Sequence, residues 1–231
     1  MDEAFDEVRS ARSSAKLLIE DEIPSTGSQF SAFYRISKRC CDFVGAVLAL
    51  LLLFPLMVAI GIAIALGDGY PVLYRQRRVG YKLRPFFIYK FRSMRKDADE
   101  ILRKDPELRK KFEQNFKLDD DPRITRIGAL LRKTSLDELP QFFNVLIGNM
   151  SLVGPRPVVE KELALYGDDA WVFEVAQPGC TGLWQCSGRS SLEYDERVKL
   201  DVEYAEKPGL FSDFTIIVKT VFSVLRRHGA Q

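Results

Sequence analysis

Two adjacent carboxylates, Asp137 and Glu138, lie in the stretch LRKTSLDELPQ (131–141), where Arg132 and Lys133 precede them. An aspartate can attack phosphorus and form an acyl phosphate. A neighbouring carboxylate can hold a divalent cation that offsets phosphate charge, and arginines can stabilise the oxygens of the transferring group. This stretch therefore raises the hypothesis of phosphoryl transfer through a covalent aspartyl intermediate.

The same residues also allow a purely structural interpretation. Ser135 and Glu138 have the spacing of a helix capping box, and acidic pairs are common in the first turn of a helix. Pro140 fits this interpretation poorly, because it would fall inside the new helix instead of at its first position. On spacing alone the cap is favoured, and both interpretations stay open.

The sequence offers few candidate residues for catalysis by histidine or cysteine. The only histidine is His228, so a Ser-His-Asp or Cys-His site would depend on that one residue. The four cysteines are an adjacent pair, Cys40 and Cys41, and then Cys180 and Cys186, and neither spacing is typical of a metal site. We expect reduced, free thiols, and chemistry carried by carboxylates, lysines, arginines or a metal with oxygen ligands.

A basic segment, 75–96, contains nine Lys or Arg and no acid, and aromatic residues are interleaved with them. Nucleic-acid binding is one interpretation. A surface facing anionic lipid and phosphorylated ligands is the favoured one, because an apolar stretch comes just before this segment. Arg156, between two prolines in VGPRP (153–157), is a further basic group that fits either anion binding or a simple turn.

That apolar stretch, Phe43–Leu66, has 24 residues and no charge. It exceeds the ~20 residues that span a bilayer. Basic residues flank it on both sides, and the positive-inside rule would keep both flanks in the cytoplasm. Pro55 at its centre removes a helix hydrogen bond. We therefore expect a re-entrant helix-break-helix, with a single kinked transmembrane helix as the alternative.

The chain is expected to divide into a flexible polar tail (1–34, with a short helix over Glu7–Leu18), a membrane segment (35–66) and one cytosolic domain (67–231). In that domain, the β-like runs 71–80 and 83–91 around Gly80 predict a hairpin. Charged helix is expected over Met94–Phe116 and a second helix over Pro140–Leu146. LDDDPRIT (118–125) and GNMSLVGPRP (148–157) read as loops.

Several longer motifs carry a family resemblance: KRCCDF, YRQRRVG, YKFRSM, DDPRITRIGALLRKTSLDELPQ, NMSLVGPRP and PGCTGLWQCSGRS. They run in order from about Lys38 to Lys219. With them the chain closely resembles the monotopic bacterial phosphoglycosyl transferases, the bacterial sugar transferase family. It is most similar to the compact members that start exopolysaccharide synthesis with galactose or glucose 1-phosphate.

The resemblance implies an α+β, mostly helical, monotopic membrane protein with a re-entrant helix, interfacial amphipathic helices and a small hairpin. It also implies a ping-pong reaction with Mg²⁺, in which Asp137 attacks the β-phosphate of a UDP-sugar and releases UMP. In this scheme Glu138 binds the metal. The implied substrate-binding residues are Lys90, Arg132, Arg156, Arg189 and Asp213.

The expected partners are a UDP-sugar, undecaprenyl phosphate, inner-membrane lipids and downstream glycosyltransferases, with no nucleic acid. The expected location is the cytoplasmic face of the bacterial inner membrane, and homo-oligomer formation is left open. Two other functions remain to be weighed. A lipid-phosphate phosphatase would use water as the final acceptor, whereas a non-catalytic scaffold would not need the acidic pair.

Overall fold

The structure is a computed structural model that describes residues 30–115, 118, 121–188 and 192–225. The chain divides into two units, Met1–Ser31 and Ala32–Gln231, and the fold given below is that of the second unit. The predicted tail falls mostly outside the described residues, and its short helix over 7–18 does so entirely.

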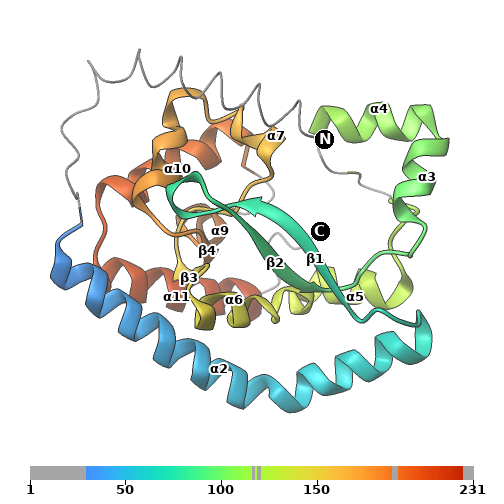
Figure 1. The fold of residues 1–231 in the computed structure, drawn as a ribbon, viewed down its shortest axis with the longest axis horizontal. Coiled ribbons are helices and arrows are strands. Elements are labelled where there is room, and N and C mark those ends of the chain that lie inside the picture. Colours follow the sequence, from blue (N-terminus) through green and yellow to red (C-terminus); the bar gives the residue numbers. More distant parts are fainter. Residues whose placement is uncertain (1–29, 116–117, 119–120, 189–191, 226–231) are drawn as a thin grey trace. The chain divides into compact units, whose positions relative to one another are not determined.

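The first element, helix α2, runs without a break from Ala32 to Gly67 and contains Pro55. Its length and apolar composition would suffice to cross a membrane. Figure 1 shows that α2 is bent near its middle, where a proline removes one hydrogen bond and crowds the preceding turn. The expected break is therefore a bend inside one continuous helix.

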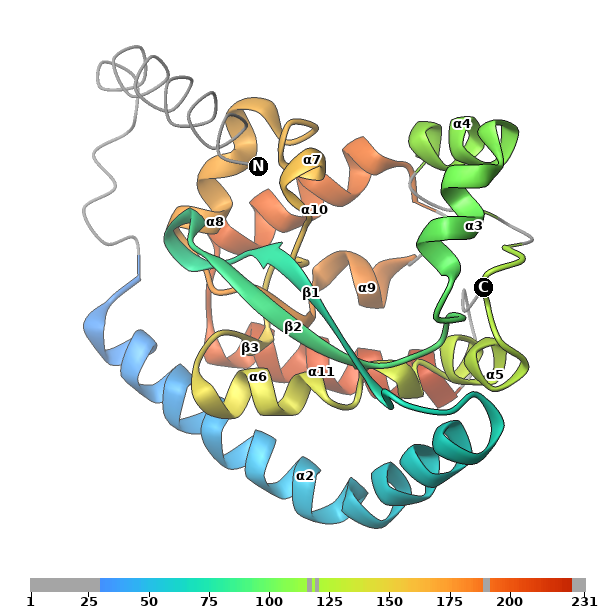
Figure 2. The same ribbon diagram turned by 45° about the vertical axis from the view of Figure 1, so that its right-hand side comes forward.

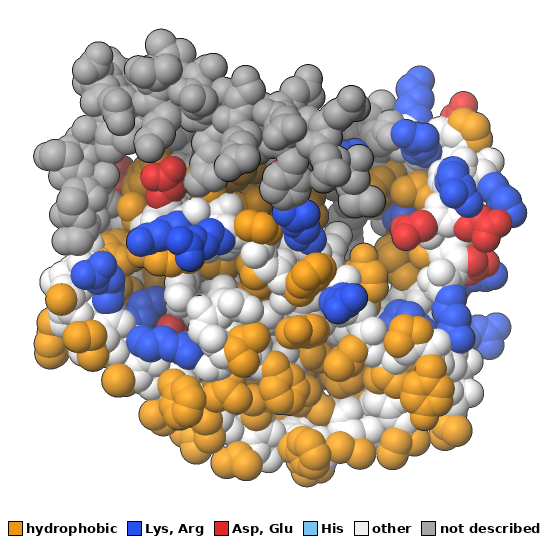
Figure 3. All heavy atoms as spheres, in the orientation of Figure 1, with side chains coloured by type: hydrophobic (Ala, Val, Ile, Leu, Met, Phe, Trp, Pro, Cys, Tyr) orange, Lys and Arg blue, Asp and Glu red, His pale blue; other side chains and the backbone are white. Residues whose placement is uncertain are grey.

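One side of α2 packs against α5 (Arg126–Thr134), α6 (Gln141–Ile147) and α11 (Leu210–Leu225). Its buried apolar residues recur at helical spacing, and the largest group is Met57, Ile60 and Ile64. The opposite side leaves many large apolar side chains exposed, including Leu52 and Leu66. Figure 3 shows hydrophobic side chains gathered along the edge of the molecule that α2 forms.

The predicted hairpin is confirmed. Strands β1 (Leu73–Val79) and β2 (Pro85–Phe91) pair antiparallel, with Tyr74 opposite Lys90 and Arg78 opposite Phe86. Opposed residues in an antiparallel pair share a face, so Arg78, Ile88 and Lys90 all face the same way.

The buried Asn144 fixes α6 beside this hairpin. Its Nδ2 donates to the Phe87 carbonyl oxygen at 2.7 Å, and its Oδ1 accepts from the Tyr89 N–H at 3.0 Å. These bonds replace the ladder partner that the outer edge of β2 lacks. Figure 2 shows α6 and α11 between α2 and the rest of the unit, as Figure 1 does.

The segment after the hairpin differs in part from expectation. The charged helical region is two helices, α3 (Ala98–Lys104) and α4 (Pro106–Asn115), and Met94 instead pairs with Ile124 in an isolated bridge. Residues 148–157 are not all loop, because Ser151–Val153 form strand β3, parallel to β4 (Gly179–Thr181). Sequence reasoning missed these strands, since three residues give no periodic pattern.

The remaining elements close the unit around a core of Tyr166, Val172 and Phe173. Their bounds are α7 Glu160–Leu163, η3 Gly167–Trp171, α8 Val172–Val175, α9 Leu183–Ser187 and α10 Tyr194–Glu206. A mostly helical α+β fold with a small hairpin is thus what the sequence predicted.

Candidate active site

A short 3-10 helix, η2 (Leu136–Glu138), carries the two adjacent acids between α5 and α6. Helix α5 ends at Ser135, which has the left-handed conformation (φ 57°, ψ 18°), and the Ser135 side chain makes no capping hydrogen bond. The capping-box interpretation is therefore wrong, because Ser135 precedes η2 in a left-handed conformation and its side chain caps no backbone N–H. Pro140 is the residue just before α6, so its ring interrupts no helical hydrogen bond.

This tight turn gives the two carboxylates different surroundings. Asp137 is buried, with 8% of its surface exposed, whereas the Glu138 side chain keeps 36% of its surface exposed. Glu138 faces a small pocket together with Arg78, Lys90 and Arg156. The other side chains that line this pocket are Ile88, Gln141, Pro157, Cys180 and Gln185.

Lys90 makes the shortest ion pair of the site. Its Nζ lies 2.6 Å from Glu138 Oε1, and its side chain is 20% exposed. Burial by itself would raise the pKa of Glu138, but the charges of Lys90, Arg156 and Arg78 outweigh burial and lower it. Glu138 is therefore held as a carboxylate at neutral pH.

Asp137 behaves in the opposite way. Burial raises the pKa of Asp137, the Glu138 charge raises it further, and Lys90 and Arg132 only partly counteract these effects. The two acids therefore differ: Glu138 is a charged carboxylate at the pocket, and Asp137 is a buried carboxyl group with a raised pKa. Pairs of acids with divergent pKa values are typical of sites where the two groups have different roles.

Arg132 reaches this region from α5, and its Nε donates to Ser93 Oγ at 2.9 Å. Gly128 makes this contact geometrically possible, because a Cβ at that position would overlap the carbonyl oxygen of Ser93. The close approach of α5 to the residues after β2 brings Arg132, Lys90 and Asp137 into one electrostatic group.

Arg156 lies just after β3, and its guanidinium stacks over the Trp184 ring at 5.5 Å from the centroid. It faces the same pocket as Glu138. The fold brings five of the candidate residues into one region, although they lie up to 66 residues apart in sequence: Lys90, Arg132, Asp137, Glu138 and Arg156.

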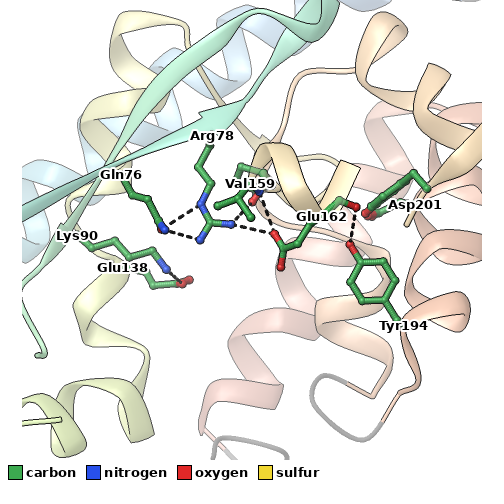
Figure 4. A network of polar contacts seen from close by, with 10 residues as sticks. Gln76, Arg78, Lys90, Glu138, Val159, Glu162, Tyr194 and Asp201 are labelled. Carbon is green, nitrogen blue, oxygen red and sulfur yellow. Dashed lines mark hydrogen bonds and ion pairs between the residues drawn. The ribbon is translucent and has the colours of Figure 1, made fainter. Parts of the chain in front are cut away.

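Arg78 is a member of the site that sequence reasoning did not single out. Its Nε and Nη2 donate to Gln76 Oε1, and its Nη1 donates to the Pro157 carbonyl oxygen at 3.1 Å and to Glu162 Oε2 at 3.3 Å. Figure 4 shows this network beside the Lys90–Glu138 pair. Alternation along β1 could have separated Gln76 and Arg78 from Arg75 and Arg77, which are exposed.

Asp213 lies in a different cluster. It accepts hydrogen bonds from Tyr34 and Tyr204 and pairs with Lys38 Nζ at 3.0 Å. These contacts join α11 to α2 and α10, so its predicted substrate contact stays a prediction while its position indicates an anchoring role. Arg189 lies outside the described residues.

The acidic pair suits Mg²⁺, which usually takes one or two protein carboxylates and completes its shell with water and substrate phosphate. Glu138 is charged and reaches the pocket, and Asp137 is its neighbour. In the part of the chain that the structure describes, no group of three or more His, Cys, Asp or Glu could hold a metal ion. The acidic pair therefore fits a Mg²⁺ ion whose remaining ligands would be water and a substrate phosphate.

The sequence matches the model of a known family and several known proteins. The model of the bacterial sugar transferase family matches residues 33–227. The chain is 48% identical over 200 residues to the undecaprenyl-phosphate galactose phosphotransferase of Salmonella typhimurium, a match that covers 85% of this chain and 42% of that protein. It is 43% identical over 199 residues to the exopolysaccharide production protein ExoY of Rhizobium meliloti, covering 84% of this chain and 88% of that protein.

A third relative is the UDP-glucose:undecaprenyl-phosphate glucose-1-phosphate transferase of Escherichia coli, 36% identical over 209 residues. The match covers 42% of this relative, as it does of the Salmonella protein, so the chain spans about two fifths of their length. With ExoY the match spans most of both chains.

Proposed function

Because the chain belongs to the bacterial sugar transferase family, we propose that it transfers a hexose 1-phosphate from a UDP-sugar to undecaprenyl phosphate and releases UMP. UDP-galactose and UDP-glucose are the favoured donors, since relatives are named for both sugars. The product would enter exopolysaccharide or glycoconjugate synthesis at its first membrane step. The observation that carries this proposal is the adjacent acidic pair, in which Glu138 faces a pocket lined by Arg78, Lys90 and Arg156 and Asp137 is buried next to it.

The reaction has two steps. A carboxylate oxygen of Asp137 attacks the β-phosphorus of the donor, the bond from that phosphorus to the UMP oxygen breaks, and UMP leaves with the electron pair. A phosphate oxygen of undecaprenyl phosphate then attacks the same phosphorus and releases the Asp137 carboxylate. The raised pKa of Asp137 makes its ionised form a stronger base, and so a better nucleophile, than an ordinary aspartate.

The basic groups have electrostatic roles. Lys90 and Arg156 face the pocket and would bind the donor's phosphates, and Arg132 would act on the side of Asp137. Preorganised cations in a half-buried site stabilise phosphoryl charge more than the same groups in water. Mg²⁺ held by Glu138 would neutralise phosphate oxygens and favour the departure of UMP.

The contacts of α2 support a re-entrant membrane helix. Near its start, Lys38 pairs with Asp213 and Arg39 donates to the carbonyl oxygens of Val145 and Leu146. At its other end, Arg92 donates to the carbonyl oxygens of Asp68 and Gly69. A helix that crossed the bilayer would place its ends on opposite sides, so one folded unit could not hold both.

Apolar side chains on other helices extend the same surface. Phe143 and Ile147 of α6 and Phe211, Phe214 and Phe222 of α11 are exposed, and both helices pack beside α2. We propose that these helices lie in the interface at the cytoplasmic face of the inner membrane, where exposed apolar surface of this kind is stabilised.

The test uses purified full-length protein in lipid nanodiscs with Mg²⁺ and a panel of UDP-sugars. Without undecaprenyl phosphate, one donor should release about one UMP per protein and leave a protein heavier by one hexose phosphate. Adding undecaprenyl phosphate should remove the adduct and start turnover. Asp137→Asn should form neither product.

The alternatives give different outcomes. Free hexose phosphate in place of the lipid product would indicate a phosphatase. A folded protein that releases no UMP from any donor would contradict the proposal and leave a scaffold role.

A further inference from the structure

The segment Pro155–Pro157, which carries Arg156, has only one backbone N–H, because proline has none. That N–H, on Arg156, donates to Asp201 Oδ2 at 3.4 Å. The Pro155 carbonyl oxygen accepts from the Gly179 N–H at 2.8 Å, and the Pro157 carbonyl oxygen accepts from Arg78 Nη1 at 3.1 Å. Three separate elements therefore hold three consecutive residues.

Asp201 is an unusual residue to find behind this segment. It lies on α10, is fully buried, and its Oδ2 also accepts from the Tyr166 O–H at 2.8 Å. Its Oδ1 has no hydrogen-bond partner among the residues that the structure describes. A buried carboxyl with an unsatisfied oxygen destabilises a fold, so stability alone does not account for an aspartate here.

The electrostatics of Asp201 link it to Arg156. Burial raises the pKa of Asp201 to about 7, although the Tyr166 and Arg156 hydrogen bonds and the Arg156 charge each act to lower it. Tyr194 lies nearby (Figure 4), and the charge of Asp201 contributes to raising the pKa of Tyr194. Of these groups, Arg156 is the one that supplies a positive charge.

Arg78 holds the other side of the segment. Its side chain is only 11% exposed, and Gln76, Pro157 and Glu162 accept from its guanidinium. Glu162 is itself fixed, because its Oε2 also accepts from the Val159 N–H at 2.9 Å. Figure 4 shows Arg78 between the Lys90–Glu138 pair and Glu162.

We propose that Asp201 and Arg78 are positioning residues that hold the Pro155–Pro157 segment from two sides and so direct Arg156 at the Glu138 pocket. This inference rests on the proposed function, in which Arg156 binds the donor's phosphates. The two residues act through Arg156, whose guanidinium is also supported by the Trp184 ring. A cation fixed in this way needs little reorganisation when the phosphates arrive.

A double-mutant cycle tests whether Asp201 acts through Arg156. Asp201→Ala should lower kcat/KM for the donor by roughly 10- to 100-fold, a loss similar to that seen when an outer-shell partner of a metal ligand is removed. In an Arg156→Ala background the same change should lower kcat/KM less than about 2-fold, because the group it positions is gone. Equal losses in both backgrounds would overturn the proposal.

Two further variants sharpen the cycle. Asp201→Asn keeps an oxygen for both hydrogen bonds and should retain most activity. Arg78→Gln removes the contact to Pro157 and should lose part of its effect in the Arg156→Ala background, with the remaining part due to the direct place of Arg78 in the pocket. Glu203→Ala, an exposed change on the same helix, is the matched control and should leave kcat/KM unchanged.

Hydrogen exchange of the full chain gives a readout that needs no activity. The Arg156 amide is the only one in Pro155–Pro157, so its exchange rate reports on this segment. This amide should exchange faster in Asp201→Ala, whereas its rate should not change in Asp201→Asn. Unchanged exchange in Asp201→Ala would contradict the positioning role even in an active enzyme. The expected exchange pattern in a protein that releases no UMP would instead contradict the proposed function alone.

Discussion

Two clusters of charged groups in this protein are built on opposite principles. Around Asp213, one carboxylate accepts from Tyr34, Lys38 and Tyr204, so each group is satisfied within the fold. Around Glu138, two adjacent carboxylates lie beside Lys90, and the charges of Arg78 and Arg156 act on each other. The first cluster joins helices, whereas the second keeps like charges together that a ligand could neutralise.

The extent of burial does not explain the difference between the two clusters. Asp213 and Asp137 are buried to a similar extent, at 7% and 8% exposed. Asp213 has three hydrogen-bond donors, but Asp137 has an acid as its neighbour and a raised pKa. The hydrogen-bond donors and charges around each carboxylate, and not its burial, therefore distinguish the structural acid from the candidate catalytic one. Four measurements test this contrast.

The largest effect is expected from Asp137→Asn. Loss of the nucleophile should lower kcat/KM by about 10³-fold or more. Thermal stability should stay equal or rise, because a raised pKa means that the folded state disfavours the charge at neutral pH. UMP release and a melting curve on the same sample check both parts, and a variant that melts lower with normal activity would reverse the assignment.

Asp213→Ala should show the converse pattern. It leaves Lys38 and two tyrosines without their shared acceptor, so we expect a loss of about 3 kcal/mol in unfolding free energy. Activity per folded molecule should be retained. Denaturant unfolding in detergent measures the loss, and Lys219→Ala, an exposed change on the same helix, is the control.

A smaller loss is expected when Lys90 becomes Met. Donor kcat/KM should fall by roughly 10- to 100-fold as one phosphate-binding cation disappears. Lys90 is also the strongest of the charges that lower the pKa of Glu138, so the acid side of the pH–rate profile should move to higher pH. Lys90→Arg keeps the charge and should leave that side of the profile in place.

The smallest effect concerns pH and stability at Asp201. With a folded pKa of about 7 against an ordinary value near 3.9, the folded state binds more protons between these pH values, so this carboxyl reduces stability as pH rises through that window. Between pH 6 and pH 8 the wild type should lose about 1 kcal/mol more than Asp201→Asn does. Parallel unfolding titrations at the two pH values decide this, and identical losses would contradict the assignment.

Part of this architecture could be predicted from local pattern. The apolar run with Pro55 became one bent helix, and the runs around Gly80 became the hairpin, because hydrophobicity and turn residues act over short distances. The acidic pair was recognisable from residue type. Its local structure was not, since Ser135 adopts a left-handed conformation that ends α5 where spacing favoured a cap.

The sequence by itself determined which groups this protein has for chemistry: a carboxylate pair, a surplus of lysines and arginines, and an apolar helix with basic flanks. Only the tertiary structure decided which of them meet. In the sequence, Arg78 cannot be told apart from the neighbouring arginines, and only the structure shows that it donates to Pro157. Asp201 contacts Arg156, which lies 45 residues earlier in the chain. Residue type is a local property, whereas a shifted pKa or an aimed guanidinium depends on neighbours that folding brings from elsewhere in the chain.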